Sequence, residues 1–327
     1  MKSVLRLVGS WDVLLVLLLV IVLGTGSSLS PYFLVGSNFT FLISDSMERA
    51  IMALPMMLII VTGEIDLSVA STLGLASSVL GLLVGVGLPL WLGIVVVLLV
   101  GVACGLVNGL LITRLGLPSL VVTLGTLALY RGLSYVVLGS NAISNFPIAF
   151  TSLGLGTIPG TIFPWSFLIF AVLALLCLIV LHFSWIGRQL YAIGNNKDAA
   201  LFAGIRVARV KLLLYMLSGL FSALAGIIFT ARFSSARADN ALGFELDVVT
   251  IVLLGGVSIF GGKGTLPGVL LSLFVVAGLR NALGLIDVTS DVQSIIIGIL
   301  LIVSVLGPNL VQRIQTAFSI RPRSARQ

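Results

Sequence analysis

Charged side chains are scarce in this chain: Asp, Glu, Lys and Arg make up 9% of its 327 residues, whereas they supply about 25% of an ordinary soluble domain. A soluble globule needs charge to cover its surface, so that class is excluded. Hydrophobic residues make up 59%, which excludes a disordered chain, and the 36 glycines and 10 prolines show no strict period, which excludes a fibre. The remaining class is a helical protein that crosses a membrane several times.

Residues that could hold a metal ion or perform covalent catalysis are also few. Cys104 and Cys177, the two cysteines, lie inside apolar runs and form no CxxC pair, so both are predicted to be packing residues. His182 is the only histidine, and no paired serine or cysteine nucleophile accompanies it. No GxxxxGK[ST] phosphate loop is present, so the chain is not expected to hydrolyse ATP by itself. We therefore expect no metal site, no cofactor bound by this chain and no enzymatic activity.

The apolar residues form continuous runs, such as 88–112, rather than the short alternating segments of a membrane β-barrel. A spanning helix needs about 20 mostly apolar residues, and fewer where it is broken inside the protein. These runs predict an all-α polytopic transmembrane helical bundle that forms one domain over residues 1–327. We expect ten spans, at 11–30, 48–62, 67–87, 90–113, 117–138, 163–183, 211–232, 247–260, 265–284 and 292–309.

The basic residues set the expected orientation, because cytoplasmic loops carry an excess of Lys and Arg. With the N-terminus inside, all basic residues fall on the cytoplasmic side except Arg49, Arg131, Arg232, Arg237 and Arg280. The acidic residues lean outward, namely Asp45, Glu48, Asp239, Glu245, Asp247, Asp287 and Asp291. Both termini are therefore predicted to be cytoplasmic, together with loop 184–210 and a basic tail at 310–327. Loops 139–162 and 233–246 are predicted to be extracytoplasmic. The net charge of +7 is explained by this orientation, so no nucleic-acid partner is expected.

Two carboxylates stand between apolar runs in the sequence Gly63-Glu64-Ile65-Asp66-Leu67-Ser68. Charges at membrane depth are costly and mark a pathway, a partner contact or a helix break. Gly63 can end one helix, and Asp66 or Ser68 can cap the next. Two interpretations stay open: Asp66 only caps while Glu64 faces cytoplasmic water, or the carboxylates line the solute path or a subunit contact.

A glycine-rich segment begins within the eighth predicted span and contains Gly255, Gly256, Gly261 and Gly262. Such glycines allow helices to break or to approach closely inside a bundle. The breaks at 63 and 255 each join a short span to a longer one, which indicates two related halves, spans 2–5 and 7–10. Broken helices at matching positions point toward the substrate route in transporters.

Polar residues also gather in two loops. In loop 184–210, Asn195, Asn196, Lys197 and Asp198 precede an apolar stretch that contains Leu201 and Phe202 and ends at Gly204, which reads as a capped short helix. That helix either lies on lipid headgroups or docks into a groove of a cytoplasmic partner. The outer loop contains the polar residues Ser234, Ser235, Arg237 and Asp239. They could bind a polyhydroxylated solute, contact a polar partner surface or belong to an ordinary solvated loop.

Four segments together resemble the permease subunits of bacterial ABC-type monosaccharide importers, a group that includes ribose, xylose, rhamnose and autoinducer-2 permeases. The segments are GEIDLSVAS at 63–71 and the stretches 105–134, 187–205 and 252–268. They follow the order and spacing of these permeases almost from end to end. Ala70 departs from the glycine that many of these permeases carry there, a small-for-small change.

This resemblance implies several partners. A second copy or a paralogue would complete a dimer in the bacterial inner membrane. A cytoplasmic ATPase would hold ATP and Mg and contact residues 195–205, and an extracytoplasmic sugar-binding protein would deliver the solute. The chain is therefore expected to be the permease of an ATP-driven importer that works by alternating access.

Two other functions are considered. One is a self-contained secondary transporter that uses Glu64 and Asp66 as ion-coupling carboxylates. The other is a membrane enzyme that acts on a lipid-linked sugar, which is disfavoured because the polar residues lie mostly at span ends.

Overall fold

The computed structural model describes the backbone of residues 11–319 and the side chains of residues 11–304 and 306. Within that range the regular elements are helices, joined by turns and two isolated bridges, Ile143–Ala236 and Thr157–Pro164. The helices are α2 (Trp11–Leu29), α3 (Gly36–Val61), α4 (Val69–Gly85), α5 (Leu90–Arg114), α6 (Ser119–Leu138), α7 (Ile148–Leu155), α8 (Trp165–Leu178), the π-helix η1 (Ile179–Phe183), α9 (Trp185–Asn195), α10 (Lys197–Phe202), α11 (Val207–Phe233), α12 (Phe244–Leu254), α13 (Leu266–Gly284) and α14 (Ser290–Ser319). The expected all-α fold is confirmed.

Each of the ten predicted spans overlaps a helix. Among residues 11–319, six segments are long and apolar enough to cross a membrane, namely α2, α5, α6, α8 with η1, α11 and α13. Three predicted boundaries differ from the helices by six residues or more. Helix α3 begins at Gly36 rather than 48, α12 ends at Leu254 rather than 260, and α14 continues to Ser319 rather than ending at 309. The α3 error arose because three charges interrupt its apolar pattern, as described below.

Two predicted loops also contain regular structure or lie partly outside the described range. Loop 139–162 contains α7, which packs on α11 and α8. The predicted basic tail 310–327 is helical up to Ser319, and its residues 320–327 lie outside the described residues. Lys2 and Arg6, which helped to set the orientation, also lie outside them.

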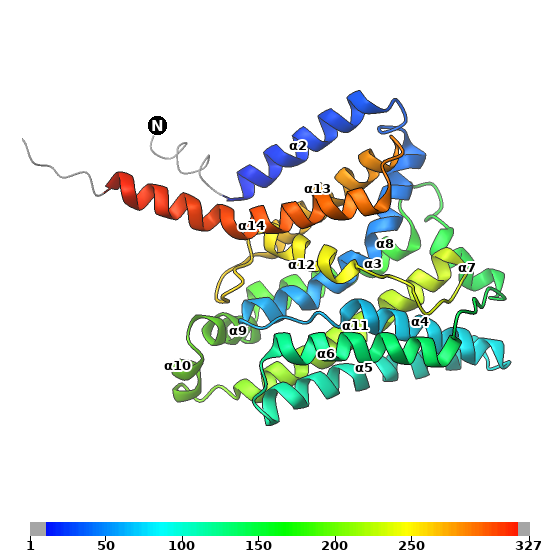
Figure 1. Cartoon of the computed structure of the whole chain (residues 1–327), viewed down its shortest axis with the longest axis horizontal. Helices are drawn as coiled ribbons and strands as arrows, with labels where there is room; N and C mark the ends of the chain where they lie inside the picture. The colour runs from blue at the N-terminus through cyan, green and yellow to red at the C-terminus, as the bar shows by residue number, and fades with distance from the viewer. Residues whose placement is uncertain (1–10, 320–327) are drawn as a thin grey trace, which may run out of the picture.

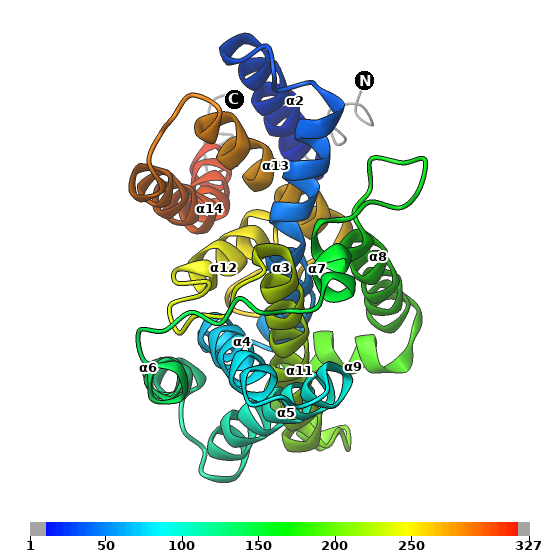
Figure 2. The same ribbon diagram turned by 90° about the vertical axis from the view of Figure 1, so that its right-hand side faces the viewer.

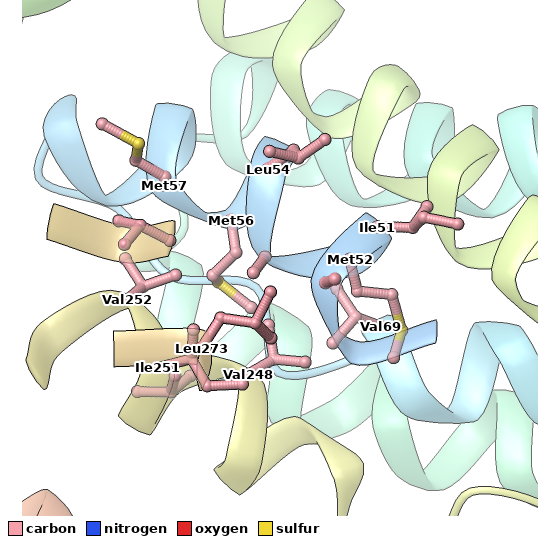
Figure 3. Packing of buried hydrophobic residues seen from close by; sticks show 14 of the residues in the cluster. Ile51, Met52, Leu54, Met56, Met57, Val69, Val248, Ile251, Val252 and Leu273 are labelled. Carbon is pink, nitrogen blue, oxygen red and sulfur yellow. The ribbon is translucent and has the colours of Figure 1, made fainter. Parts of the chain in front are cut away.

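Helices α3 and α11 occupy the centre of the bundle (Figure 2). Nearly every residue of α3 from Ser46 to Val61 is buried. Figure 3 shows Met52, Met56 and Met57 of α3 near Val248 and Val252 of α12 and Leu273 of α13. These unbranched side chains fill irregular gaps between helices that cross at different angles.

The helices on either side of this centre make corresponding contacts. Helix α4 packs on α5 and α6, and α12 packs on α13 and α14. Helix α11 contacts α4 and α5, and α3 contacts α12 and α13. Helices α3–α6 and α11–α14 are the two sets that the sequence analysis treated as related halves.

The two ends of the bundle differ. Helices α9 and α10 lie at one end, here termed the α10 end, and α7 lies at the opposite one, termed the α7 end (Figure 1). The beginning of α2 and the C-terminal end of α14 are both directed toward the α10 end (Figure 1). Exposed side chains of six basic residues lie in the segments of that end: Arg114, Arg188, Lys197, Arg206, Arg209 and Lys263.

Candidate functional site

The chain breaks between α3 and α4 around a buried carboxylate. Gly63 adopts φ +78°, a conformation that glycine tolerates, and ends α3. Asp66 then accepts hydrogen bonds from the backbone N–H of Ser68 at 3.0 Å and from the Ser68 hydroxyl at 2.7 Å. Its second oxygen accepts from the Ser218 hydroxyl of α11 at 2.7 Å. Asp66 therefore closes the turn before α4 and also ties this turn to α11.

Glu64 does not simply face water, as one interpretation of the sequence held. It forms an ion pair with Lys211, whose side chain is buried on α11. Lys211 was placed on the cytoplasmic side, as the first residue of the predicted span 211–232, but α11 begins four residues earlier, at Val207, and so carries Lys211 into the bundle. The ion pair explains how a charge is tolerated there.

Neighbouring helices satisfy the remaining polar groups of this break. Asn108 of α5 donates to the Ser68 hydroxyl at 2.8 Å. Tyr215 of α11 donates to the Ile65 carbonyl at 3.2 Å, and Ser119 of α6 accepts from the Ile65 N–H at 3.3 Å. Irregular backbone inside a membrane bundle is tolerated only where such partners exist. The break is thus fixed by three surrounding helices.

The second, glycine-rich break meets the first. Gly255 caps α12, Gly256 follows it with φ +84°, and Gly261 and Gly262 also have positive φ. The N–H of Gly262 donates to the Val61 carbonyl at the end of α3 at 2.9 Å. Modelling a Cβ onto Gly261 would bring it against Gly63, so only glycine allows this approach. The sequence predicted two breaks but not that they touch.

Helix α9 packs against the same place. A Cβ on Gly194 would collide with the Val61 carbonyl and the Gly262 N–H, so the backbones are in close contact. Tyr191 of α9 donates to the Gly264 carbonyl at 2.6 Å. The end of α9 is therefore wedged between the two breaks.

The predicted capped helix is present as α10. The Asn196 side chain accepts from the Ala199 N–H at 3.0 Å, and Asn195 donates to the Tyr191 carbonyl. Asp198 lies in the first turn, and Gly204 follows the helix with φ +83°. Ala200 packs inward, whereas the Leu201 and Phe202 side chains are 50% and 94% exposed. An exposed apolar pair of this kind is a feature of surfaces that contact a partner protein or a membrane.

At the α7 end, the loop after α11 is tied down. Ser234 adopts a left-handed conformation, the backbone of Ala236 pairs with Ile143, and the Ser235 carbonyl accepts from Asn240. Arg131 of α6 donates to the carbonyls of Ala238 and Asn240 at 2.7 and 2.8 Å. This loop is an ordered part of the bundle.

Arg237 and Asp239 form an exposed ion pair on this loop, with an Nε to Oδ1 distance of 2.9 Å. The hydrogen bond from Arg237 lowers the pKa of the Asp239 carboxyl below its usual value. The pair borders a small cavity of about 160 Å³, also lined by Tyr135 and Asn141.

A largely buried network of six charges is the largest polar feature that sequence reasoning missed. The carboxylates are Asp45 and Glu48 of α3 and Asp247 of α12, and the guanidiniums are Arg49 of α3, Arg232 of α11 and Arg280 of α13. All six were placed toward the outer side from the sequence, but their pairing was not predicted. They pair because α3 extends to Gly36 and carries its three charges within the helix, beside those of α11, α12 and α13.

The network has a defined order of contacts. Arg232 binds Glu48 at 2.8 Å and Asp45 at 3.1 Å. Arg49 binds Asp45 at 3.1 Å and Asp247 at 2.7 Å, and Arg280 binds Asp247 at 2.6 Å. Arg49 and Arg232 also lie over the rings of Phe244 and Phe233, which adds a cation–π contribution.

One signal in the sequence could have revealed this network. Asp45, Glu48 and Arg49 are spaced three and four residues apart, so they share one helical face and can turn toward neighbours. Arg280 lies inside a predicted span, where a charge requires a partner. Which partners they find depends on the packing of four helices and cannot be read from the sequence.

The fold and these buried polar breaks define a polytopic helical permease. Residues 38–305 match the family described as "Branched-chain amino acid transport system / permease component". The chain is also similar to proteins named "Autoinducer 2 import system permease protein LsrD". It is 36% identical to the one from Yersinia enterocolitica over 92% of both chains, and 35% identical to the one from Photorhabdus laumondii over 92% of this chain and 91% of that one. The protein from Escherichia coli is 36% identical over 92% of this chain and 93% of that one.

The chain belongs to this permease family, and the predicted resemblance to permease subunits of ABC-type importers is confirmed. It is a transport component rather than an enzyme. No solved structure matches the chain.

Proposed function

We propose that this chain is the transmembrane permease of an ATP-driven importer for a monosaccharide or a similar small polyol, including autoinducer-2-like molecules. The family match over residues 38–305 and the similarity to autoinducer 2 permeases over 92% of the chain carry the proposal. The family description names branched-chain amino acids, but the named relatives act on autoinducer 2, so we favour the polyol.

In the proposed topology, ten helices span the bacterial inner membrane and both termini are cytoplasmic. The α10 end is then the cytoplasmic face. The exposed basic residues of that end support this orientation through the positive-inside bias, as does the direction of α2 and α14. The corresponding contacts of α3–α6 and α11–α14 support two halves related by a repeat.

In the proposed mechanism, α10 docks on a separate ATPase subunit that holds ATP and Mg. Its exposed Leu201 and Phe202 enter an apolar groove of the partner. The ATPase moves α10 between two positions as it binds and releases ATP. Because α9 is wedged between the two breaks, that movement reaches both α3 and the α12–α13 loop. A second permease copy or a paralogue completes the path, and an extracytoplasmic binding protein delivers the solute.

Transport by the complete complex in vesicles tests this function. We expect ATP-dependent uptake of labelled D-ribose, L-rhamnose or autoinducer 2. The Phe202→Ala variant should lose most uptake while the ATPase still turns over, because the contact that transmits movement is gone. Phe183→Ala is the matched control, since Phe183 is 74% exposed on η1 and is not on α10.

Two results would count against the proposal. Normal uptake and normal substrate-stimulated ATP hydrolysis in Phe202→Ala would contradict the proposal that α10 docks on the ATPase. Ion-driven uptake by this chain without an ATPase would instead favour a secondary transporter that uses Asp66, the break carboxylate that is not already paired with a lysine in the described structure.

A further inference from the structure

A polar cavity of about 390 Å³ lies next to the charge network. Asn38, Asp45 and Arg49 of α3, Arg280 and Asn281 of α13 and Gln293 of α14 contribute its polar lining. Sites for small molecules have volumes of about 300–1,000 Å³, so the cavity has room for one small solute. It lies in the half of α3 that points away from the α10 end.

The charges around the cavity balance. The network runs in the order Glu48, Arg232, Asp45, Arg49, Asp247, Arg280, with each carboxylate beside a guanidinium. Three negative and three positive charges sum to zero. A bound anion would need a free cation, but both arginines that line the cavity already bind Asp247. The balance therefore disfavours a phosphorylated or otherwise anionic ligand.

The cavity nevertheless has unused hydrogen-bonding groups. Arg280, the last member of the network, lines the cavity and donates to Asp247 through Nη2, and among the described residues no hydrogen bond from its Nη1 is found. The Asp45 side chain is 34% exposed. Asn38 and Asn281 bond each other in both directions, at 2.8 and 2.9 Å. Asn38 donates its second N–H to the Phe33 carbonyl, so the pair offers the second N–H of Asn281 and the remaining lone pairs of the two amide oxygens.

A cavity wall that carries both donors and acceptors suits the hydroxyl groups of a polyol. Each hydroxyl both donates and accepts, so adjacent hydroxyls can accept from Arg280 and donate to Asp45. A branched-chain amino acid would instead need a free cation for its carboxylate and an apolar pocket for its side chain. We propose that this cavity is a binding subsite for an uncharged polyhydroxylated solute of monosaccharide size, reached from the α7 end. This inference rests on the proposed function and adds the place where the solute is held.

Filling the cavity tests the proposal. Ala277 lines it, and Ala277→Leu would occupy the space where the solute would lie. In the complete complex we expect at least a tenfold loss of D-ribose, L-rhamnose and autoinducer 2 uptake, with basal ATP hydrolysis retained. Ala103→Leu is the matched control, because Ala103 is exposed on α5 and lies away from the cavity. Unchanged uptake in Ala277→Leu would overturn the inference while the proposed function stands.

A labelling experiment separates the subsite from a folding defect and from the transport function. Cys104 and Cys177 are buried, so Ala277→Cys in a chain with both replaced by alanine provides one reactive thiol. We expect a membrane-impermeant maleimide added from the extracytoplasmic side to label it, and the transported sugar to slow labelling severalfold. D-ribose 5-phosphate should have no effect. Absence of labelling, or equal protection by the phosphate, would overturn the inference, even if transport is normal.

Discussion

At the α7 end of the bundle, three carboxylates, two of them buried, each touch at least one guanidinium, whereas at the α10 end Asp66 is held by two serines. Both regions hold charge in an apolar bundle, where an isolated ion is very costly. The charge network satisfies its carboxylates with guanidiniums from α3, α11 and α13. The break satisfies Asp66 with hydroxyl and backbone donors, and only Glu64 has a cation.

This difference suits different tasks. Six interlocked ions tolerate little movement, because shifting one helix would separate charges that are buried on several sides. Hydroxyl groups rotate and can exchange partners at little cost. We therefore expect the α7 end to act as a rigid framework around the cavity and the α10 end to rearrange more readily. The predictions below test this contrast from the largest expected effect to the smallest.

Removing Arg232 should cause the largest loss of stability. Arg232→Ala leaves Glu48, whose side chain is fully buried, without a cation. Breaking such a pair costs about 3–5 kcal/mol, which denaturant unfolding of the purified complex in detergent would measure. Arg237→Ala is the control, since that arginine is 54% exposed. The double variant Arg232→Gln with Glu48→Gln should recover part of the loss, and equal unfolding energies for wild type and Arg232→Ala would refute the rigid framework.

Crowding the contact between α9 and the breaks should have the second largest effect. Gly194→Ala would push a methyl group into the Val61 carbonyl, and overpacking of this kind costs about 1–3 kcal/mol. We also expect ATP hydrolysis to continue while uptake falls. In Gly125→Ala on α6 the added methyl meets open space, so this variant should be neutral or slightly stabilising. Full uptake in Gly194→Ala would show that the contact of α9 with the two breaks does not transmit the movement of the ATPase.

Neutralising Asp66 should lower the free energy of unfolding by less than the two changes above. In Asp66→Asn the amide oxygen still accepts from Ser68, and the Ser218 hydroxyl can turn to accept from the new amide. We expect a loss of at most about 1 kcal/mol in the free energy of unfolding. Asp247→Asn is the matched comparison, and it should cost more because it weakens the bonds to both Arg49 and Arg280. Equal losses of unfolding free energy in Asp66→Asn and Asp247→Asn would contradict the proposed difference between the break and the charge network.

The exposed pair of Arg237 and Asp239 should have the smallest effect. The pKa of Asp239 is lowered in the folded chain, so the pair stabilises the fold above the ordinary aspartate pKa of about 3.9. That contribution disappears as the pH falls through the lower folded-state pKa. Because the pair is exposed, wild type and Asp239→Asn should melt within the scatter of repeat measurements at pH 7. A melting difference that grows as the pH falls from 7 to 3 would have the opposite sign and contradict this assignment.

Particular residues show how far sequence reasoning reached. Asn196 and Gly204 marked the limits of α10, because a side-chain cap and a glycine stop are local signals. Gly63 and Asp66 marked a helix break for the same reason. The start of α3 was misplaced because Asp45, Glu48 and Arg49 indicated the boundary between membrane and water. These charges can lie within the bundle because partners on other helices neutralise them.

The sequence by itself determined the class of protein, the approximate place of the ten helices that overlap the predicted spans and the family, because run lengths, scarcity of charge and short motifs are properties of the chain. The tertiary structure decided which charges pair, that the two glycine breaks touch, and where a polar cavity remains. Asp45 and Arg232, which form an ion pair, are 187 positions apart. The Val61 carbonyl and the Gly262 N–H, which form a hydrogen bond, are also far apart in the sequence. Contacts at such separations depend on how all the helices pack together, and no local pattern encodes them.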